Sequence, residues 1–101
     1  LLEDAKMLER IGCFALVLEK IPAKLAQKVA ESISIPVIGI GAGSGVDGQV
    51  LVLHDMIGMT HEFSPRFLRR YMNLFEDMTK AIGQYVADVK SEDFPNANEQ
   101  Y

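Results

Sequence analysis

Two apolar runs separated by an amphipathic stretch restrict the fold of this chain more than any other feature. Residues 14–18 (FALVL) are apolar throughout, which is typical of a strand buried on both faces, and residues 35–40 (IPVIGI) form a second apolar run. Between them, Leu25, Val29 and Ile33 recur at helical spacing. A strand, a helix and a second strand in this order predict a βαβ unit with parallel strands and a right-handed crossover. The predicted fold class is therefore α/β.

The N-terminal residues predict a helix that precedes the βαβ unit. Leu1, Leu8 and Ile11 fall on one side of a helix with Ala5 between them, and Gly12 is a preferred residue just past a helix C-terminus. We therefore expect an amphipathic helix over residues 1–11. The chain has no initiator Met and begins inside this pattern, so we expect it to be part of a longer chain.

The segment from 49 to 57 (QVLVLHDMI) is compatible with two structures. Its apolar residues from Val50 to Leu53 favour a third strand. Residues 42–48 are too few for the helix that usually connects parallel strands. Either the crossover is a bare loop or part of 49–57 is helical, and of the two structures we expect the strand.

A long helix is expected in the C-terminal half of the chain. Ser64 followed by Pro65 is a typical helix start, and apolar residues then recur at intervals of three and four as far as Val89. Residues 1–90 would then belong to a single domain. The polar residues 91–101 predict a loosely packed C-terminal tail.

Composition and charge argue against several classes of partner. The chain has 101 residues and a formal net charge of −4, which disfavours nucleic acid or an acidic membrane as a partner. The one basic cluster, Arg66, Arg69 and Arg70, fits a solvated helix face. No apolar run is long enough to span a bilayer. Cys13 is the only cysteine, so an intrachain disulfide is impossible, and a reducing cytoplasm is the expected compartment.

The glycines after the second apolar run do not match a nucleotide-binding loop. Read from Gly39, the sequence is G-I-G-A-G-S, with Ser44 where the dinucleotide fingerprint requires its third glycine. No Lys-Ser or Lys-Thr pair directly follows these glycines, which excludes a Walker A loop. The pattern is instead typical of a tight turn at a strand end, where Gly41 and Gly43 are candidates for contact with a substrate.

Polar residues follow each of the expected strands. Because ligands of parallel α/β folds bind outside the carboxyl ends of the strands, we expect Glu19, the glycine turn and the pair His54–Asp55 to face one site. Glu19 is the candidate proton acceptor, and its alternative role is an acid at the N-terminus of the next helix. His54 and Asp55 lack the third partner of a catalytic triad or a metal site. Asp47 is expected to cap the turn that follows it.

Several stretches of the sequence together resemble a known enzyme family. They are “LVLEKIP” at 16–22, “IPVIGIGAG” at 35–43, “DGQVLVLHD” at 47–55 and the Phe-Pro pair at 94–95. In this combination they resemble ketopantoate hydroxymethyltransferase, over nearly the whole chain. Lys20 differs from the residue expected at its place in the family, whereas the pattern Glu-x-x-Pro around it is intact.

The resemblance implies a fold and a reaction. The family is a (β/α)8 TIM barrel, of which this chain would be the C-terminal portion, with about three strands and their helices. The reaction transfers a hydroxymethyl group from 5,10-methylenetetrahydrofolate to 3-methyl-2-oxobutanoate and gives 2-dehydropantoate, an intermediate of pantothenate and coenzyme A biosynthesis. Mg²⁺ chelates the 2-oxo acid and stabilises its enolate as a Lewis acid. A cytoplasmic homo-oligomer is also implied.

Within this chain, the resemblance implies one catalytic role. Glu19 matches the family's proton acceptor. The magnesium ligands of the family lie on earlier strands, upstream of residue 1, so no metal ligand is expected here and the chain alone is expected to be inactive. Two alternatives remain: a non-catalytic α/β binding or assembly module, and a related enolate-forming barrel of the phosphoenolpyruvate mutase and isocitrate lyase type.

Overall fold

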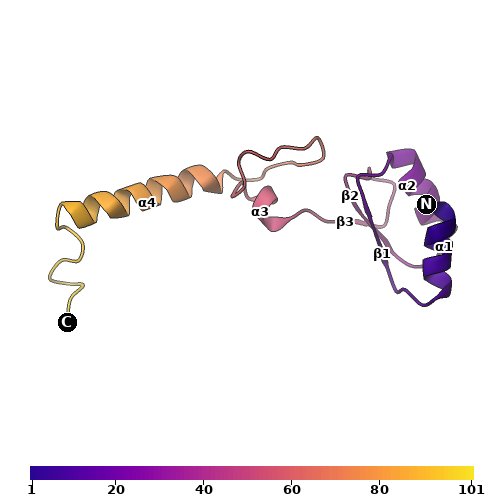
Figure 1. The fold of residues 1–101 in the computed structure, drawn as a ribbon, viewed down its shortest axis with the longest axis horizontal. Coiled ribbons are helices and arrows are strands. Elements are labelled where there is room, and N and C mark those ends of the chain that lie inside the picture. Colours follow the sequence, from indigo (N-terminus) through magenta and orange to yellow (C-terminus); the bar gives the residue numbers. More distant parts are fainter. The chain divides into compact units, whose positions relative to one another are not determined.

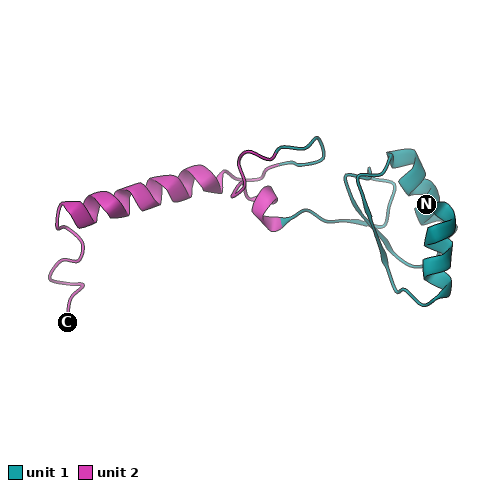
Figure 2. Ribbon diagram, in the orientation of Figure 1, with its two compact units in different colours: residues 1–52, 64–69 teal, residues 53–63, 70–101 magenta.

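The computed structural model describes all of residues 1–101 (Figure 1). The helices and strands are α1 (Leu2–Arg10), β1 (Leu16–Glu19), α2 (Ala23–Ser32), β2 (Val37–Ile40), β3 (Gly48–Gln49), α3 (Leu53–Met56) and α4 (Leu74–Lys90). They divide between two compact units (Figure 2). Unit 1 comprises residues 1–52 and 64–69, and unit 2 comprises residues 53–63 and 70–101.

Unit 1 is built on a parallel sheet with the strand order β1-β2-β3. Val17 pairs with Ile38 in the first ladder, and Ile38 pairs with Gly48 in the second. The helix α2 connects β1 to β2, and Figure 1 shows α1 and α2 side by side on the same face of the sheet. The predicted βαβ unit with parallel strands is confirmed.

The core of unit 1 lies between the sheet and its two helices. Leu16 and Leu18 of β1 and Val37 of β2 are buried on the helix side, where Ala26 and Val29 of α2 are completely buried. The small side chain at position 26 lets α2 approach the sheet closely. The core cluster consists of Ala5, Leu16, Leu18, Ala26, Val29, Val37 and Ala42.

The other face of this sheet has no helix on it, which contradicts the prediction that the first strand is buried on both faces. Side chains alternate along β1, so Val17 points away from Leu16 and Leu18 and is 65% exposed. Phe14, before the strand, is 90% exposed. A strand that is apolar on both sides but covered on only one side requires further layers to bury it.

The N-terminal helix forms as predicted. Gly12 has φ +98°, a conformation that suits glycine, and its N–H donates to the carbonyl of Glu9 as the helix ends. On the apolar side, Ala5 is buried and Leu8 packs against the core cluster, whereas Leu1 and Ile11 at its two ends are 47% and 71% exposed. The middle of the apolar side therefore faces the core of unit 1.

A third strand is present, but its predicted position is wrong. The strand β3 covers only Gly48–Gln49, and the ladder ends where the N–H of Val50 donates to the carbonyl of Gly39 at 3.0 Å. The following Leu53–Met56 is the helix α3. Both open alternatives therefore hold, because the connection from β2 to β3 is a bare loop and part of 49–57 is helical. Short apolar segments carry no period that separates the two structures.

The predicted start of the C-terminal helix is also wrong. The helix α4 begins at Leu74, with Asn73 as the N-cap whose side chain accepts from the N–H of Glu76, and it continues through Gly83 to Lys90. Before it, the N–H of Tyr71 donates to the carbonyl of Met56 at 2.7 Å, and that of Leu74 donates to Ile57. These donors are therefore paired with a distant segment and not with residues four positions earlier.

The residues upstream of α4 include the basic cluster at 66, 69 and 70, which therefore does not form a helix face. The single-domain assignment of residues 1–90 stays a prediction. Residues 91–101 contain no helix or strand, and their side chains are exposed. No helix in the chain has both the length and the apolar character needed to cross a membrane.

Candidate functional site

Glu19 lies at the carboxyl end of β1, where the sequence placed the proton acceptor. It pairs in register with Ile40, the last residue of β2. Its side chain is exposed and alternates with Leu18, so it shares the helix-free face of the sheet with Val17. Its carboxylate takes part in none of the side-chain hydrogen bonds or ion pairs of the chain, so it is available to a ligand.

The structure disfavours the alternative role for Glu19 as a helix N-terminal acid. The next helix, α2, begins at Ala23 with Pro22 as its N-cap, and its first turn contains no acidic residue. Glu19 instead belongs to the strand, and the chain reverses direction between it and the helix. Its position is that of a strand-end residue in a parallel α/β site.

The turn after Glu19 is strained. Lys20 has φ +53°, a left-handed conformation that costs a residue with a side chain about 1–2 kcal/mol. Its N–H still donates to the carbonyl of Ile40 at 2.8 Å, so β1 remains paired with β2 up to the turn. Backbone strain that the surrounding structure maintains is concentrated at functional sites, which is consistent with a ligand-binding role for this turn.

The glycine turn lies at the carboxyl end of β2, beside the Glu19–Lys20 turn. Gly41 and Gly43 have φ +65° and +79°, a backbone conformation that suits the tight turn expected at this strand end. A Cβ on Gly41 would lie 2.8 Å from Cδ1 of Phe67, and one on Gly43 would lie 2.5 Å from Cβ of Ala23. Both positions therefore exclude larger residues, while a direct contact of either glycine with substrate stays a prediction.

Two polar side chains hold the loop that carries these glycines. The carboxylate of Asp47 accepts from the N–H of Val37 at 2.7 Å, so it connects the loop to the start of β2. Asp47 was instead expected to cap the turn at residues 48–49. The amide of Gln49 donates to the carbonyl of Gly43 at 2.8 Å. Sequence reasoning missed this role of Gln49, because it depends on a contact six residues away.

A cavity of about 580 Å³ opens at this edge of unit 1. It is lined by Lys20, Gly41, Gly43, Pro65, Arg66 and Phe67. A smaller cavity of about 310 Å³ shares Gly41, Gly43 and Phe67 with it. Sequence reasoning missed residues 65–67 because it assigned them to the first turns of a helix. Glu19 is not among the lining residues, but Lys20 directly follows it.

His54 and Asp55 are not brought to this site by a third strand. They lie in α3 of unit 2, where the carbonyl of His54 accepts from the N–H of Met59 at 2.9 Å and that of Asp55 accepts from Gly58. Their side chains form neither a triad nor a metal site. We expected them to face the same site as Glu19 because a strand was expected to end just before them. The structure has the helix α3 there instead.

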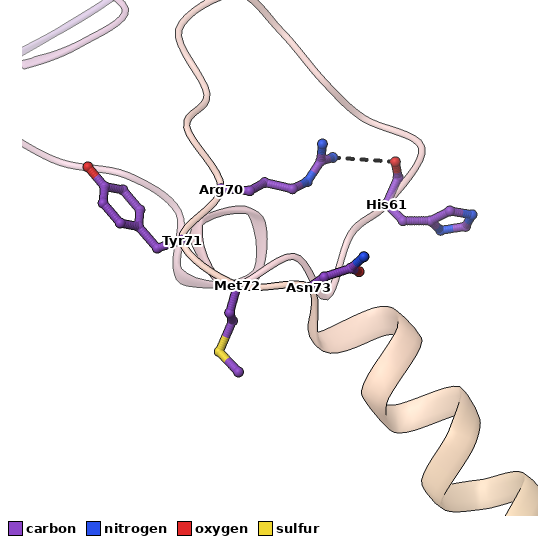
Figure 3. Close-up of a pocket in the computed structure, with 5 residues that line it drawn as sticks. All are labelled: His61, Arg70, Tyr71, Met72 and Asn73. Atoms are coloured by element: carbon purple, nitrogen blue, oxygen red, sulfur yellow. Dashed lines mark hydrogen bonds between the residues drawn. The ribbon is translucent and has the colours of Figure 1, made fainter.

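Unit 2 has a cavity of its own, of about 480 Å³, lined by His61, Arg70, Tyr71, Met72 and Asn73 (Figure 3). The guanidinium of Arg70 donates to the carbonyl of Thr60 at 3.0 Å and to that of His61 at 3.4 Å, and also to that of Phe63. In Figure 3 the side chains of Tyr71 and Met72 point away from the guanidinium of Arg70. Arg70 therefore organises the loop that precedes it in unit 2.

Comparison with known proteins decides the family. The sequence model of the family described as ketopantoate hydroxymethyltransferase matches residues 1–97. The chain belongs to this family. The resemblance noted in the sequence is confirmed, and the phosphoenolpyruvate mutase and isocitrate lyase alternative loses its support.

Curated relatives carry the name 3-methyl-2-oxobutanoate hydroxymethyltransferase. The protein of Flavobacterium johnsoniae is 79% identical over 101 residues, which are 100% of this chain and 37% of that protein. The protein of Christiangramia forsetii is 71% identical over 98 residues, which are 97% of this chain and 36% of that protein. The protein of Parabacteroides distasonis is 69% identical over 101 residues, which are 100% of this chain and 37% of that protein. The chain thus spans little more than a third of the length of these relatives.

The ketopantoate hydroxymethyltransferase family gives the site a chemical context. The chain contains no group of three His, Cys, Asp or Glu side chains that is arranged to hold a metal ion. The candidate site of this chain therefore consists of the carboxylate of Glu19 and the cavity that Lys20 lines.

Proposed function

We propose that this chain is part of a (β/α)8 barrel that transfers a hydroxymethyl group from 5,10-methylenetetrahydrofolate to 3-methyl-2-oxobutanoate and forms 2-dehydropantoate. In this proposal, Glu19 is the proton acceptor. The whole enzyme would act in the cytoplasm as a homo-oligomer, with the 2-oxo acid and the folate as its small-molecule partners. Family membership supports the reaction, and the position of Glu19 supports its role.

The one-sided sheet supports a place within a barrel. In such a barrel, helices cover the outside of the strands, while inward side chains from several strands fill the interior in layers. Unit 1 has this arrangement, with α1 and α2 on one face and with Val17 and Ile38 on the other. The strand order β1-β2-β3, parallel throughout, is the order of consecutive barrel strands. We therefore assign the helix-free face to the barrel interior.

Glu19 is suited to remove a proton from the 2-oxo acid. The hydrogen on the carbon next to the keto group is acidic because its removal gives an enolate. The carboxylate of Glu19 projects from the carboxyl end of β1, the end at which barrels of this kind bind substrates. It is not engaged by any other side chain, so it can approach that hydrogen and hold the proton. The enolate carbon then forms a bond to the one-carbon unit of the folate, a water molecule supplies the hydroxyl oxygen, and tetrahydrofolate is released.

Magnesium has no assigned ligand in this chain. The chain contains no group of three His, Cys, Asp or Glu side chains that could hold a metal ion. In this proposal, residues outside 1–101 supply the ligands of the family's ion, which would stabilise the enolate when bound.

The position of Glu19 carries the proposal, and its substitution tests it. The whole enzyme can be built by placing these 101 residues in the matching segment of the Flavobacterium johnsoniae protein, which is 79% identical there. In this chimera, Glu19→Gln should reduce kcat by about a thousandfold, because it removes a general base, while KM for the 2-oxo acid changes little. Measuring both parameters separates catalysis from binding.

Glu3→Gln is the matched control for this substitution. Glu3 is also a carboxylate of unit 1, on α1, with a side chain that is 85% exposed. Its amide variant should keep the kcat of the chimera. Normal turnover in Glu19→Gln would remove Glu19 from the proton-acceptor role. A folded chimera without activity toward 3-methyl-2-oxobutanoate would support instead the non-catalytic alternative for this chain.

A further inference from the structure

The cavity of unit 1 is lined by two cations and no acid. Its lining residues include Lys20 and Arg66, and none of the others carries a charge. Neither cation forms an ion pair or a side-chain hydrogen bond within the chain. The nearest acid in sequence is Glu19, which is not part of the lining. In a chain with a net charge of −4, this is a local site for an anion.

The remaining walls are apolar. They include the rings of Phe67 and Pro65, and the ring of Phe67 occupies the space that a side chain at Gly41 would fill. The two glycines leave the backbone on this side without side chains. An aromatic ring in the wall favours a flat aromatic ligand, because stacked aromatic pairs are stabilised beyond the burial of their area.

The volume and the charges together indicate the class of ligand. A cavity of about 580 Å³ lies within the range of small-molecule sites. A small 2-oxo acid would leave most of it empty and would satisfy only one of the two cations. An aromatic amide that carries two carboxylates would fill it, with its ring against the apolar wall and its carboxylates near the cations.

We propose that this cavity binds the aminobenzoyl-glutamate part of the folate donor, with the ring against Phe67 and the carboxylates on Lys20 and Arg66. This inference rests on the proposed function, which supplies a folate as the co-substrate. It places the donor beside the Glu19–Lys20 turn. The one-carbon unit thus approaches from the edge of the sheet where the proton acceptor lies.

The direct test is the binding of p-aminobenzoylglutamate to the whole chimeric enzyme, measured by calorimetry. Lys20→Gln and Arg66→Gln should each weaken binding by about tenfold, because each removes a charge-assisted hydrogen bond. Lys20→Arg and Arg66→Lys keep the charge and should keep most of the affinity. Raising the salt concentration should weaken binding to the unsubstituted enzyme more than to the Gln variants.

Two neighbouring cations serve as matched controls. Arg69 lies three residues after Arg66, and Lys24 lies in α2, and neither lines the cavity. Arg69→Gln and Lys24→Gln should bind p-aminobenzoylglutamate as the unsubstituted enzyme does. Equal losses in the controls and in the cavity variants would overturn the inference, as would unchanged affinity in all four.

Kinetics separates this inference from the proposed function. In the active chimera, Lys20→Gln and Arg66→Gln should raise KM for the folate donor and leave KM for 3-methyl-2-oxobutanoate unchanged. A normal KM for the donor in both variants would refute the assignment of this cavity to the donor and would leave the proposed transferase reaction unaffected. Glu19→Gln should lose turnover and still bind p-aminobenzoylglutamate normally. A chimera that binds this probe through Lys20 and Arg66 but transfers nothing would refute only the proposed reaction.

Discussion

The buried apolar side chains of this protein all lie in unit 1, whereas the 17-residue helix α4 of unit 2 buries none. Val29 in α2 is completely buried, while Ile82 in α4 is 59% exposed. Both helices have a clear apolar side. The difference is that α2 has a sheet to cover, whereas α4 has no second layer within its unit.

Unit 2 is held in place by polar and aromatic contacts instead. Arg70 binds the carbonyls of the preceding loop, and the ring of His61 stacks on Phe75 with centroids 3.7 Å apart. An apolar stripe in the sequence therefore predicts a helix but does not predict that the stripe is buried. The exposed apolar surface of both units is surface that other parts of an enzyme can cover.

The largest effect is expected when the chain is removed from any such cover. Expressed alone, the 101-residue chain should be unfolded, aggregated or dependent on a partner, and it should have no transferase activity. The helix-free face of the sheet and the unpaired edges of β1 and β3 both favour this outcome. Circular dichroism and sedimentation would measure it. A soluble monomer with a cooperative melt would show that unit 1 needs no further layer.

Glycine substitutions in the whole chimeric enzyme contrast the two units. Gly43→Val should destabilise it by at least about 3 kcal/mol, because a β-branched residue would adopt a positive φ and collide with Ala23. Gly83→Ala should stabilise it by about 1 kcal/mol, because Gly83 lies within α4 and a Cβ there has no neighbour within 4 Å. Urea denaturation gives both values. Effects of the same sign and size would mean that the two environments are alike.

The polar organisation of unit 2 is tested by Arg70→Met. Losing the bonds to the loop carbonyls should cost about 2 kcal/mol locally and speed amide exchange in residues 59–63. Amides of β1 and β2 should exchange as before. Arg69→Met is the control, because no hydrogen bond or ion pair holds its side chain. Unchanged exchange in Arg70→Met would show that the loop is held by its aromatic contacts alone.

The smallest effect concerns one carboxylate of unit 1. The carboxylate of Glu9 accepts hydrogen bonds from the hydroxyl and from the N–H of Ser34. These bonds hold the pKa of Glu9 below its usual value of 4.5. Because the folded-state pKa is lowered, the stabilisation is fully present above pH 4.5 and is lost as pH falls through the folded-state value. Ser34→Ala should therefore lower Tm at neutral pH, and the difference from the unsubstituted enzyme should shrink in acid. A difference that is independent of pH would contradict the assignment.

The sequence predicted those parts of the fold that depend on local pattern. The runs at 14–18 and 35–40 indicated parallel strands, and Gly12 indicated the end of the first helix. The segment from Val50 to Leu53 was misassigned because short apolar runs have no distinguishing period. The start of α4 was misassigned because the N–H groups of Tyr71 and Leu74 bind a segment far away in the sequence.

The candidate site was predictable to a similar extent. Glu19 and the glycine turn follow apolar strands, so their position at the carboxyl ends could be inferred from the order of residues alone. The cavity could not be inferred, because Arg66 and Phe67 come to the site from a segment that resembles the start of a helix. The strain at Lys20 likewise has no signature in a single sequence.

The most direct test of the account is hydrogen exchange at the carbon next to the keto group of 3-methyl-2-oxobutanoate. The chimeric enzyme should catalyse this exchange in D2O without any folate, because the proton acceptor acts before the one-carbon unit is needed, and NMR would follow the loss of the proton signal. Glu19→Gln should slow this exchange by about a thousandfold, while Glu3→Gln should exchange at the rate of the unsubstituted enzyme. Equal exchange rates in the two variants would show that Glu19 is not the proton acceptor.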